Sequence, residues 1–182
     1  NNKQCTSGDL VLIDVGAEYA NYACDVTRCF PVNGKFTDRQ REVYESVLRV
    51  EKDSIELLKP GAVLSDYHKR VGDIMTKELI NLNLLSQEEV DNQNPSWPAY
   101  KKYFMHGTSH YLGLDVHDYG LWDGSPMEAG MVFTCEPGIY IPEEGIGIRI
   151  EDDILITSNG YINLTKEIPK EVSEIEAAMK TG

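Results

Sequence analysis

The chain has 182 residues, a formal net charge of −13 at pH 7 and 41% hydrophobic residues. This length fits one domain with a substantial core, so we predict a single domain over residues 1–182. The acidic balance argues against nucleic-acid binding through a basic surface. No apolar run approaches the ~18 residues that a membrane-spanning helix needs.

Two strand-like segments open the chain, at residues 10–17 and 22–30, both rich in Val, Ile, Tyr and Phe. A hairpin between them would turn at residues 19–20. Asp14 and Asp25 are equally far from that turn, so they would lie directly opposite, with Cβ atoms ~4.5–5.5 Å apart. Two carboxylates at that separation repel unless a cation lies between them. The first hairpin therefore predicts half of a metal site.

Three helices are predicted next. Thr37 is the expected N-cap of a long first helix, and Gln40 three residues later completes a capping box. Lys-Pro-Gly at residues 59–61 ends this helix. A second helix begins near Ser65, and a short third one is capped by Ser86.

The stretch before the second hairpin is rich in histidine. It contains His106, His110 and His117 within Met-His-Gly-Thr-Ser-His-Tyr-Leu-Gly-Leu-Asp-Val-His-Asp. Gly107 and Gly113 indicate tight backbone near a site. A lone histidine is more often a satisfied core residue than a ligand, so these histidines gain meaning only together with the acids.

The second hairpin repeats the arrangement of the first. Residues 131–141 and 146–156 are strand-like, and Pro-Glu-Glu-Gly at 142–145 is a turn. Glu136 and Glu151 are equally far from this turn. The hairpin therefore predicts a second pair of opposed carboxylates.

A short strand at residues 161–164 and an amphipathic helix at 169–179 close the chain. Strand pair, helices, strand pair and final helix indicate an α+β fold, with an antiparallel sheet and helices on one face. Side chains alternate between the two faces of a strand, so the two acids of each hairpin can lie on one face. The acid-bearing faces of the two hairpins can then point to one site.

Together the two hairpins and the histidine stretch offer five donors, namely Asp14, Asp25, His110, Glu136 and Glu151. Four carboxylates, one imidazole and no thiolate suit a pair of hard or borderline divalent ions. The alternative is a solvated acidic face. It is disfavoured because several of these acids lie inside apolar strand runs, where an unpaired charge is costly.

With these motifs in place, the chain resembles the pita-bread metallopeptidases, the family of methionine aminopeptidase, prolidase and aminopeptidase P. The resemblance covers residues 8–179. The run from His106 to Asp118 is similar to the aminopeptidase P and prolidase branch, because methionine aminopeptidases usually lack a counterpart of His106. The stretch Phe-Pro-Val-Asn-Gly-Lys-Phe-Thr from Phe30 is likewise similar to aminopeptidase P, as is the closing Pro-Lys-Glu-Val-Ser-Glu-Ile-Glu from Pro169.

The resemblance assigns metal roles to the five donors. Asp14 would chelate one ion, His110 and Glu136 would hold the other, and Asp25 and Glu151 would bridge both. Two divalent ions are expected, with Mn²⁺ favoured and Co²⁺, Zn²⁺ or Fe²⁺ as alternatives.

The resemblance also implies catalytic residues. His106 and His117 would bind the substrate carbonyl and stabilise the tetrahedral intermediate. Glu136 would manage the proton of the attacking water. Arg149, which shares a strand face with Glu151, would hold that carboxylate or the substrate. For His106, His117 and Arg149 a purely structural hydrogen bond is the alternative.

The expected activity is release of the N-terminal residue of a peptide by metal-hydroxide attack on the first peptide bond. The resemblance implies the Xaa-Pro type, or the mitochondrial type that removes one bulky residue from imported proteins. A dipeptidase such as prolidase and a non-catalytic peptide-binding module of the same fold are the alternatives. We expect a homodimer that acts on peptide or protein N-termini.

The start of the chain carries a further expectation. Aminopeptidase P relatives have a His-Tyr pair, opening helices and a whole domain upstream of the position of Asn1. We therefore expect the N-terminal part of the pita-bread domain to be missing, and this piece of a longer enzyme to have little activity by itself.

The four cysteines are Cys5, Cys24, Cys29 and Cys135, and none forms a Cys-x-x-Cys pair. Cys24 and Cys135 each precede a candidate ligand, so strand alternation points them away from the metals. We expect the cysteines to be reduced and buried, which favours an intracellular compartment. The resemblance favours the mitochondrion, with the cytoplasm as the alternative.

Overall fold

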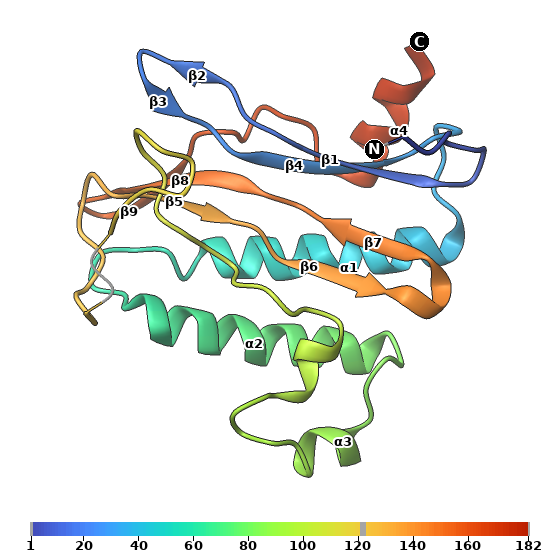
Figure 1. The fold of residues 1–182 in the computed structure, drawn as a ribbon, viewed down its shortest axis with the longest axis horizontal. Helices are drawn as coiled ribbons and strands as arrows, with labels where there is room; N and C mark the ends of the chain where they lie inside the picture. The colour runs from blue at the N-terminus through green and yellow to red at the C-terminus, as the bar shows by residue number, and fades with distance from the viewer. Residues whose placement is uncertain (1, 121–122, 182) are drawn as a thin grey trace.

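The computed structural model describes residues 2–120 and 123–181 (Figure 1). Residues 1 and 182, the ends of the predicted domain, lie outside that part. The strands are β1 Leu10–Val15, β2 Glu18–Tyr19, β3 Tyr22–Ala23, β4 Val26–Pro31, β5 Val132–Cys135, β6 Gly138–Ile141, β7 Ile146–Arg149, β8 Asp152–Thr157 and β9 Gly160–Asn163. The α-helices are α1 Asp38–Ile55, α2 Leu64–Asn81, α3 Gln87–Asp91 and α4 Val172–Ala178. Short 3-10 helices are η1 Ala99–Lys102, η2 Pro142–Glu144 and η3 Met179–Thr181.

The elements stack in layers (Figure 1). Strands β1 and β4 cross over β7, helix α1 packs on the other side of β5, β6 and β7, and α2 packs against α1. Every strand pair in the described residues is antiparallel. The predicted α+β arrangement, an antiparallel sheet with the long helices on one face, is confirmed.

The core lies between the sheet and the two long helices. From α1 it takes Val43, Val47 and Val50, and the sheet contributes Ile139 and Ile148, all with no exposed surface. The apolar face of α1 therefore decides which side of the sheet it covers. On the opposite side, β1 and β4 add Leu10, Leu12 and Cys29 to the same core.

The first hairpin turns one residue later than predicted. Ala20 and Asn21 both have left-handed backbone, with φ of 52° and 64°, as a two-residue hairpin turn requires. Asp14 therefore lies opposite Thr27 rather than Asp25, so the predicted direct opposition is wrong. Asp14 and Asp25 are instead diagonal neighbours on one face of the hairpin, because residues two apart share a strand face. Their carboxyl groups are still in hydrogen-bond contact.

The second hairpin has the predicted register. Strands β6 and β7 pair Gly138 with Arg149 on either side of the η2 turn, and β5 and β8 continue the same register. That register places Glu136 directly across from Glu151. The predicted opposition of the two glutamates is confirmed.

The ladder opens where these glutamates lie. The backbone N–H of Glu136 donates to Thr108 O at 2.8 Å, and that of Glu151 donates to Thr27 O at 3.1 Å. Each glutamate is therefore bonded to a different neighbour: the histidine stretch on one side and β4 on the other. The second hairpin, the histidine stretch and β4 therefore meet at these two glutamates.

The helix signals are largely confirmed. Thr37 and Gln40 form the predicted capping box of α1, and Ser86 caps α3 in the same way. Helix α1 ends at Ile55, earlier than the predicted stop at 59–61, because the following residues bond three positions back in tighter turns. Helix α4 is shorter than predicted, since its N-cap is Glu171. No helix of the described residues combines the length and apolarity needed to cross a bilayer.

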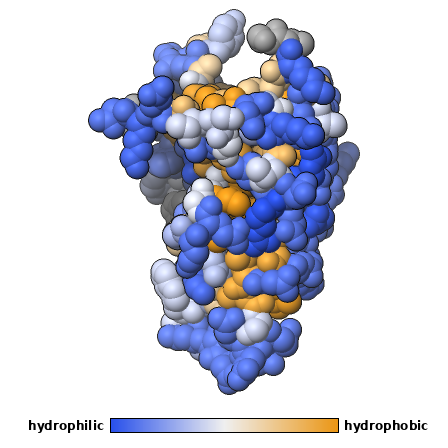
Figure 2. Space-filling model, turned by 90° about the vertical axis from the view of Figure 1, so that its right-hand side faces the viewer, coloured by the Kyte–Doolittle hydropathy of each residue, from blue (hydrophilic) through white to orange (hydrophobic). Residues whose placement is uncertain are grey.

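The surface seen in Figure 2 is mostly hydrophilic, with apolar side chains in separate areas. Its lower end, which carries α3, is hydrophilic, and α3 buries none of its residues. The helix lies at the edge of the core, against which it packs its partly buried Val90.

All four cysteines are unpaired. Cys29 and Cys135 are buried, Cys24 is partly buried and Cys5 is exposed, so the expected burial is wrong for Cys5. Burial raises the pKa of Cys29 to about 11, which keeps this thiol protonated and unreactive.

A buried ion network lies behind Glu151. Arg28 Nη2 is 2.6 Å from Asp152 Oδ1, and Lys170 Nζ is 2.5 Å from Asp152 Oδ2 and 2.6 Å from Glu51 Oε1. Arg28 Nη1 also donates to the backbone carbonyl of Glu151 at 2.6 Å. The network ties α1, β4 and the C-terminal segment to the strand that follows Glu151.

Removing the guanidinium from this network is expected to destabilise the fold strongly. Arg28→Met leaves the fully buried Asp152 carboxylate short of one cation, so we expect a loss of about 3–5 kcal/mol in the free energy of unfolding. Urea denaturation followed by circular dichroism measures it. The matched control is Arg39→Met, because the Arg39 pair with Glu144 is about one-third exposed and is expected to contribute less than about 1 kcal/mol. Equal losses in the two variants would contradict this view.

Candidate metal centre

One cavity of about 590 Å³ gathers every site residue predicted from the sequence. Its lining residues are Asp14, Asp25, His106, Gly107, Ser109, His110, His117, Glu136, Arg149 and Glu151. They come from the first hairpin, the histidine stretch and the opened ladder of the second hairpin. Segments more than 130 positions apart in the chain thus share one cavity.

The histidine stretch reaches the cavity by running beside β5. Leu112 N–H donates to Val132 O at 3.1 Å, and Thr134 N–H donates to His110 O at 3.0 Å. The bond from Glu136 N–H to Thr108 O continues this pairing. The stretch therefore acts as an added edge segment, which fixes His110 relative to Glu136.

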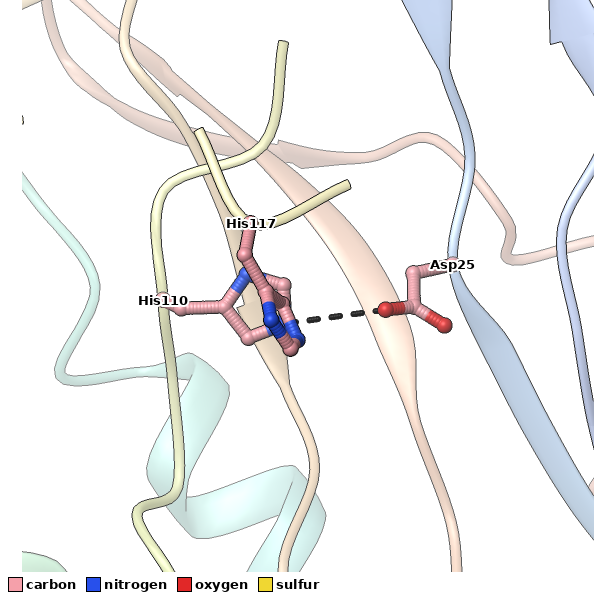
Figure 3. Close-up of side chains that lie close together, drawn as sticks. All are labelled: Asp25, His110 and His117. Carbon is pink, nitrogen blue, oxygen red and sulfur yellow. Dashed lines mark ion pairs between the residues drawn. The ribbon is translucent and has the colours of Figure 1, made fainter. Parts of the chain in front are cut away.

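The His110 ring is oriented by its own backbone neighbour. Its Nδ1 donates to the carbonyl of Tyr111 at 3.0 Å, since a carbonyl only accepts. Nε2 is left facing the acids, 3.5 Å from Asp25 Oδ2 and 3.6 Å from Glu136 Oε1 (Figure 3). This is the tautomer of a metal-ligating histidine, with the second nitrogen held by a backbone carbonyl.

The donor atoms form three overlapping groups, and within each group all of them lie within 4.8 Å of one another. One group is Asp14, Asp25 and Glu151, a second is His110, Glu136 and Glu151, and a third is Asp25, His110 and His117. Asp25, Glu151 and His110 each belong to two groups. Of these three, only the carboxylates have two oxygens with which to bridge two adjacent cations, so Asp25 and Glu151 are the candidate bridging residues.

The pKa shifts of the acids indicate a site that binds positive charge. Burial raises the pKa of Glu151 to about 8, and repulsion from Glu136 and Asp25 adds to this despite a hydrogen bond from Thr27. Burial likewise raises the pKa of Glu136 and of Asp14. Carboxylates crowded in a low-dielectric cavity are stable in ionised form only next to cations. The residues present therefore fit a pair of divalent ions.

Asp25 and His110 shift each other's pKa. Although burial opposes it, hydrogen bonds with His110 and Asp14 lower the pKa of Asp25. Although burial lowers the pKa of His110, its contacts with Asp25 and Glu136 raise it. Both shifts favour the ionised carboxylate of Asp25 and positive charge beside it.

Arg149 faces the cavity as its strand parity predicts. Its Nη2 forms an ion pair with Asp14 Oδ2, and its Nε donates to Thr27 Oγ1 at 3.0 Å. Thr27 in turn donates to Glu151 Oε2 at 2.5 Å. Arg149 and Thr27 together hold two of the candidate ligands, and the role of Thr27 was not predicted.

Tyr140 is a second residue that sequence reasoning missed. Its hydroxyl lies 2.8 Å from His106 Nε2 and accepts from Arg149 Nη1 at 3.5 Å. Space for the ring comes from Gly138 and Gly147, where an added Cβ would lie 2.7 Å and 3.3 Å from the tyrosine. Two glycines around a tyrosine in a paired hairpin are the sequence signal that could have found it.

His117 and His68 complete the surroundings. The His117 ring is exposed and lies edge-on to His110, with ring centroids 4.4 Å apart (Figure 3). His68, for which no role was predicted, accepts from Thr108 N–H at 3.3 Å through Nδ1. It supports the histidine stretch from α2 rather than lining the cavity.

Comparisons with known proteins agree with this geometry. Residues 1–158 match metallopeptidase family M24. The chain is 47% identical over 190 residues to the Xaa-Pro aminopeptidase of Haemophilus influenzae, which covers 98% of this chain and 44% of the relative. It is 37% identical over 189 residues to the mitochondrial intermediate cleaving peptidase 55 of Arabidopsis thaliana, covering 98% and 36%.

A solved structure has a similar fold. Zinc-substituted Escherichia coli aminopeptidase P in complex with product has a TM-score of 0.87 and 48% identity, over 96% of this chain and 42% of that one. The predicted pita-bread fold and the resemblance to aminopeptidase P are confirmed. The chain spans about two-fifths of the length of these relatives.

Proposed function

The chain belongs to metallopeptidase family M24, and from that premise we propose that it carries the metal site of an aminopeptidase that releases the N-terminal residue of peptides whose second residue is proline. The observation that carries this proposal is the single cavity in which the donor groups overlap at Asp25 and Glu151. All five donors expected of the family branch are present. This favours a hydrolase over the non-catalytic peptide-binding module.

We assign the ligands as follows. Asp14 serves one ion, His110 and Glu136 serve the other, and Asp25 and Glu151 serve both. Oxygen-rich donors with one imidazole favour Mn²⁺, with Co²⁺, Zn²⁺ or Fe²⁺ as alternatives. When bound, the ions polarise a carbonyl oxygen and lower the pKa of a coordinated water.

The protein's own groups supply the remaining chemistry. Glu136 lines the cavity with its Oε1 3.6 Å from His110 Nε2, which places its carboxylate to take a proton from water and later give it up. His106 and His117 line the same cavity and donate to the carbonyl oxygen as negative charge develops on it. Arg149 keeps Asp14 in place through its ion pair.

Substrate length and compartment are part of the proposal. The relatives support an Xaa-Pro aminopeptidase, and the Arabidopsis relative supports the type that acts in mitochondria on a bulky first residue. Prolidase, a dipeptidase, is the alternative. The homodimer and the single-domain boundaries stay predictions.

A peptidase assay with Mn²⁺ on the full-length protein tests the function, because little activity is expected of this piece by itself. The substrates are an Xaa-Pro tripeptide, an Xaa-Pro dipeptide and a peptide with a bulky first residue and no proline. Preferred release of the first residue from the tripeptide supports an aminopeptidase, whereas a dipeptide preference would make the protein a prolidase. Stoichiometric metal without hydrolysis of any of the three would overturn the enzyme reading.

Tyr140→Phe is expected to weaken catalysis without loss of metal. The substitution removes the hydroxyl that holds His106 while keeping the ring between its two glycines. One hydrogen bond contributes about 0.5–1.5 kcal/mol, so we expect kcat to fall about two- to tenfold. Steady-state kinetics with elemental analysis measure both quantities, and metal loss in this variant would show that Tyr140 supports the ligands instead.

A further inference from the structure

The loop that carries His117 is closed by the side chain next to it. Both carboxylate oxygens of Asp118 accept backbone N–H groups, Oδ2 from Leu114 at 2.9 Å and Oδ1 from Tyr119 at 2.7 Å. The backbone N–H of Asp118 donates to Tyr111 O at 3.0 Å. Tyr111, Leu114 and Tyr119 therefore all bond to Asp118, which closes residues 111–118 into a loop.

His117 depends on this loop for its position. Its ring makes no hydrogen bond to any of the described residues, and its contact in the site is the edge-on packing against His110. A side chain without hydrogen bonds is placed by its backbone and by packing alone. The loop backbone, and hence Asp118, decides where the His117 nitrogens lie relative to the cavity.

The loop is also fastened to the first hairpin. Ala23 N–H donates to Gly113 O at 2.7 Å, and the Tyr22 hydroxyl donates to Leu112 O at 3.1 Å. These contacts lie beside Asp25, so the loop and the candidate bridging carboxylate share one support. Opening the loop would change the separation between His117 and the acids.

Gly113 makes room for the closure. A Cβ at this position would lie 2.1 Å from Asp118 Oδ2 and 3.1 Å from its Cγ. Any side chain at 113 would push the carboxylate away from the Leu114 amide. The glycine and the aspartate therefore work as a pair.

We propose that Asp118 is a positioning residue for catalysis, which acts through the backbone of residues 111–118 to hold His117 beside the metal centre. This inference rests on the proposed function, in which His117 donates to the substrate carbonyl. Asp118 itself belongs to none of the donor groups, so its removal leaves the ligand set intact.

Asp123 offers a matched control within the same chain. Its Oδ1 accepts from Ser125 N–H at 2.9 Å and from Ser125 Oγ at 2.5 Å, so it also closes a local turn through its carboxylate. That turn carries no residue of the cavity. Asp123→Ala separates a general effect of losing a turn aspartate from a specific effect on His117.

The kinetic test is a double-mutant cycle on Xaa-Pro peptide hydrolysis. Because a misplacement of ~1 Å can cost about 100-fold, Asp118→Ala is expected to lower kcat by up to about 100-fold. Metal content should not change, and Asp123→Ala should match the wild type. Added to His117→Ala, the Asp118→Ala change should cause little further loss, since both act through one ring. Additive losses, or wild-type kcat in Asp118→Ala, would overturn the proposal.

A spectroscopic test stands independently of peptidase activity. In NMR spectra of the metal-free protein, the His117 Hε1 resonance should be single in the wild type and in Asp123→Ala. It should shift or broaden in Asp118→Ala and in Gly113→Ala, with faster hydrogen exchange at the Leu114 amide. An unchanged His117 resonance in both variants would refute the positioning role. If the full-length wild type hydrolyses no peptide, the proposed function fails, while these spectra still decide whether Asp118 places His117.

Discussion

Asp25→Asn is expected to lose both metal ions, whereas Asp14→Asn is expected to retain one. Asp25 belongs to two of the three donor groups and Asp14 to only one. A carboxylate shared by two cations neutralises both, so its replacement by a neutral amide weakens both sites at once. Elemental analysis of each variant, purified with Mn²⁺ and dialysed, gives the ion count per chain. Hydrolysis is expected to be abolished in Asp25→Asn.

Asp115→Asn is the control for this comparison. Asp115 lies on the neighbouring loop, lines the adjoining surface hollow with Asp14 and Asp25, and belongs to no donor group. It should keep both ions, because removing a nearby charge is not the same as removing a ligand. Loss of both ions in Asp14→Asn, with one retained in Asp25→Asn, would reverse the assignment of the bridging carboxylate.

In the full-length protein, His117→Ala is expected to lower kcat by about 100- to 1,000-fold while the metal content stays unchanged. The expected size follows from removing one preorganised donor to a developing oxyanion. The result matters because the structure also places His117 in a donor group with Asp25 and His110. Kinetics and elemental analysis on the same preparation therefore separate a substrate-binding role from a ligand role.

The neighbouring Tyr119→Ala serves as control for His117→Ala. The Tyr119 side chain is 87% exposed, and its backbone N–H, which bonds to Asp118, survives the substitution. Wild-type kcat is expected there. A parallel loss of metal in His117→Ala would instead make this histidine a ligand and remove it from substrate binding.

Local patterns were sufficient for the donors and for the second hairpin. Glu136 and Glu151 are opposed as predicted, because strand alternation and the turn at η2 fix the register between residues close in the chain. The chemistry of the donor set follows in the same way from residue types. Residue types and the conformation of a single hairpin therefore determine these features without contacts between distant segments.

The first hairpin shows where local patterns stop. Placing its turn at the centre of the segment between the two strand-like runs, at residues 19–20, is wrong by one residue, because Ala20 and Asn21 adopt left-handed backbone. Since each one-residue move of a turn centre shifts the pairing by two, Asp14 faces Thr27 instead. The acids still meet, since a shift of two residues preserves the face of the strand.

Only the tertiary structure decided how the cavity is held together. The bond from Thr27 to Glu151 joins residues 124 positions apart, and that between Tyr140 and His106 joins residues 34 apart. Thr27 carries no local signal of its own, because a hydroxyl on a strand is equally common on a solvated face. The glycines at 138 and 147 mark the place of the Tyr140 ring but not its partner His106. Hydrogen bonds between distant segments depend on the packing of whole layers, so the five candidate donors and Arg149 could be predicted from the sequence, whereas Thr27 and Tyr140 could not.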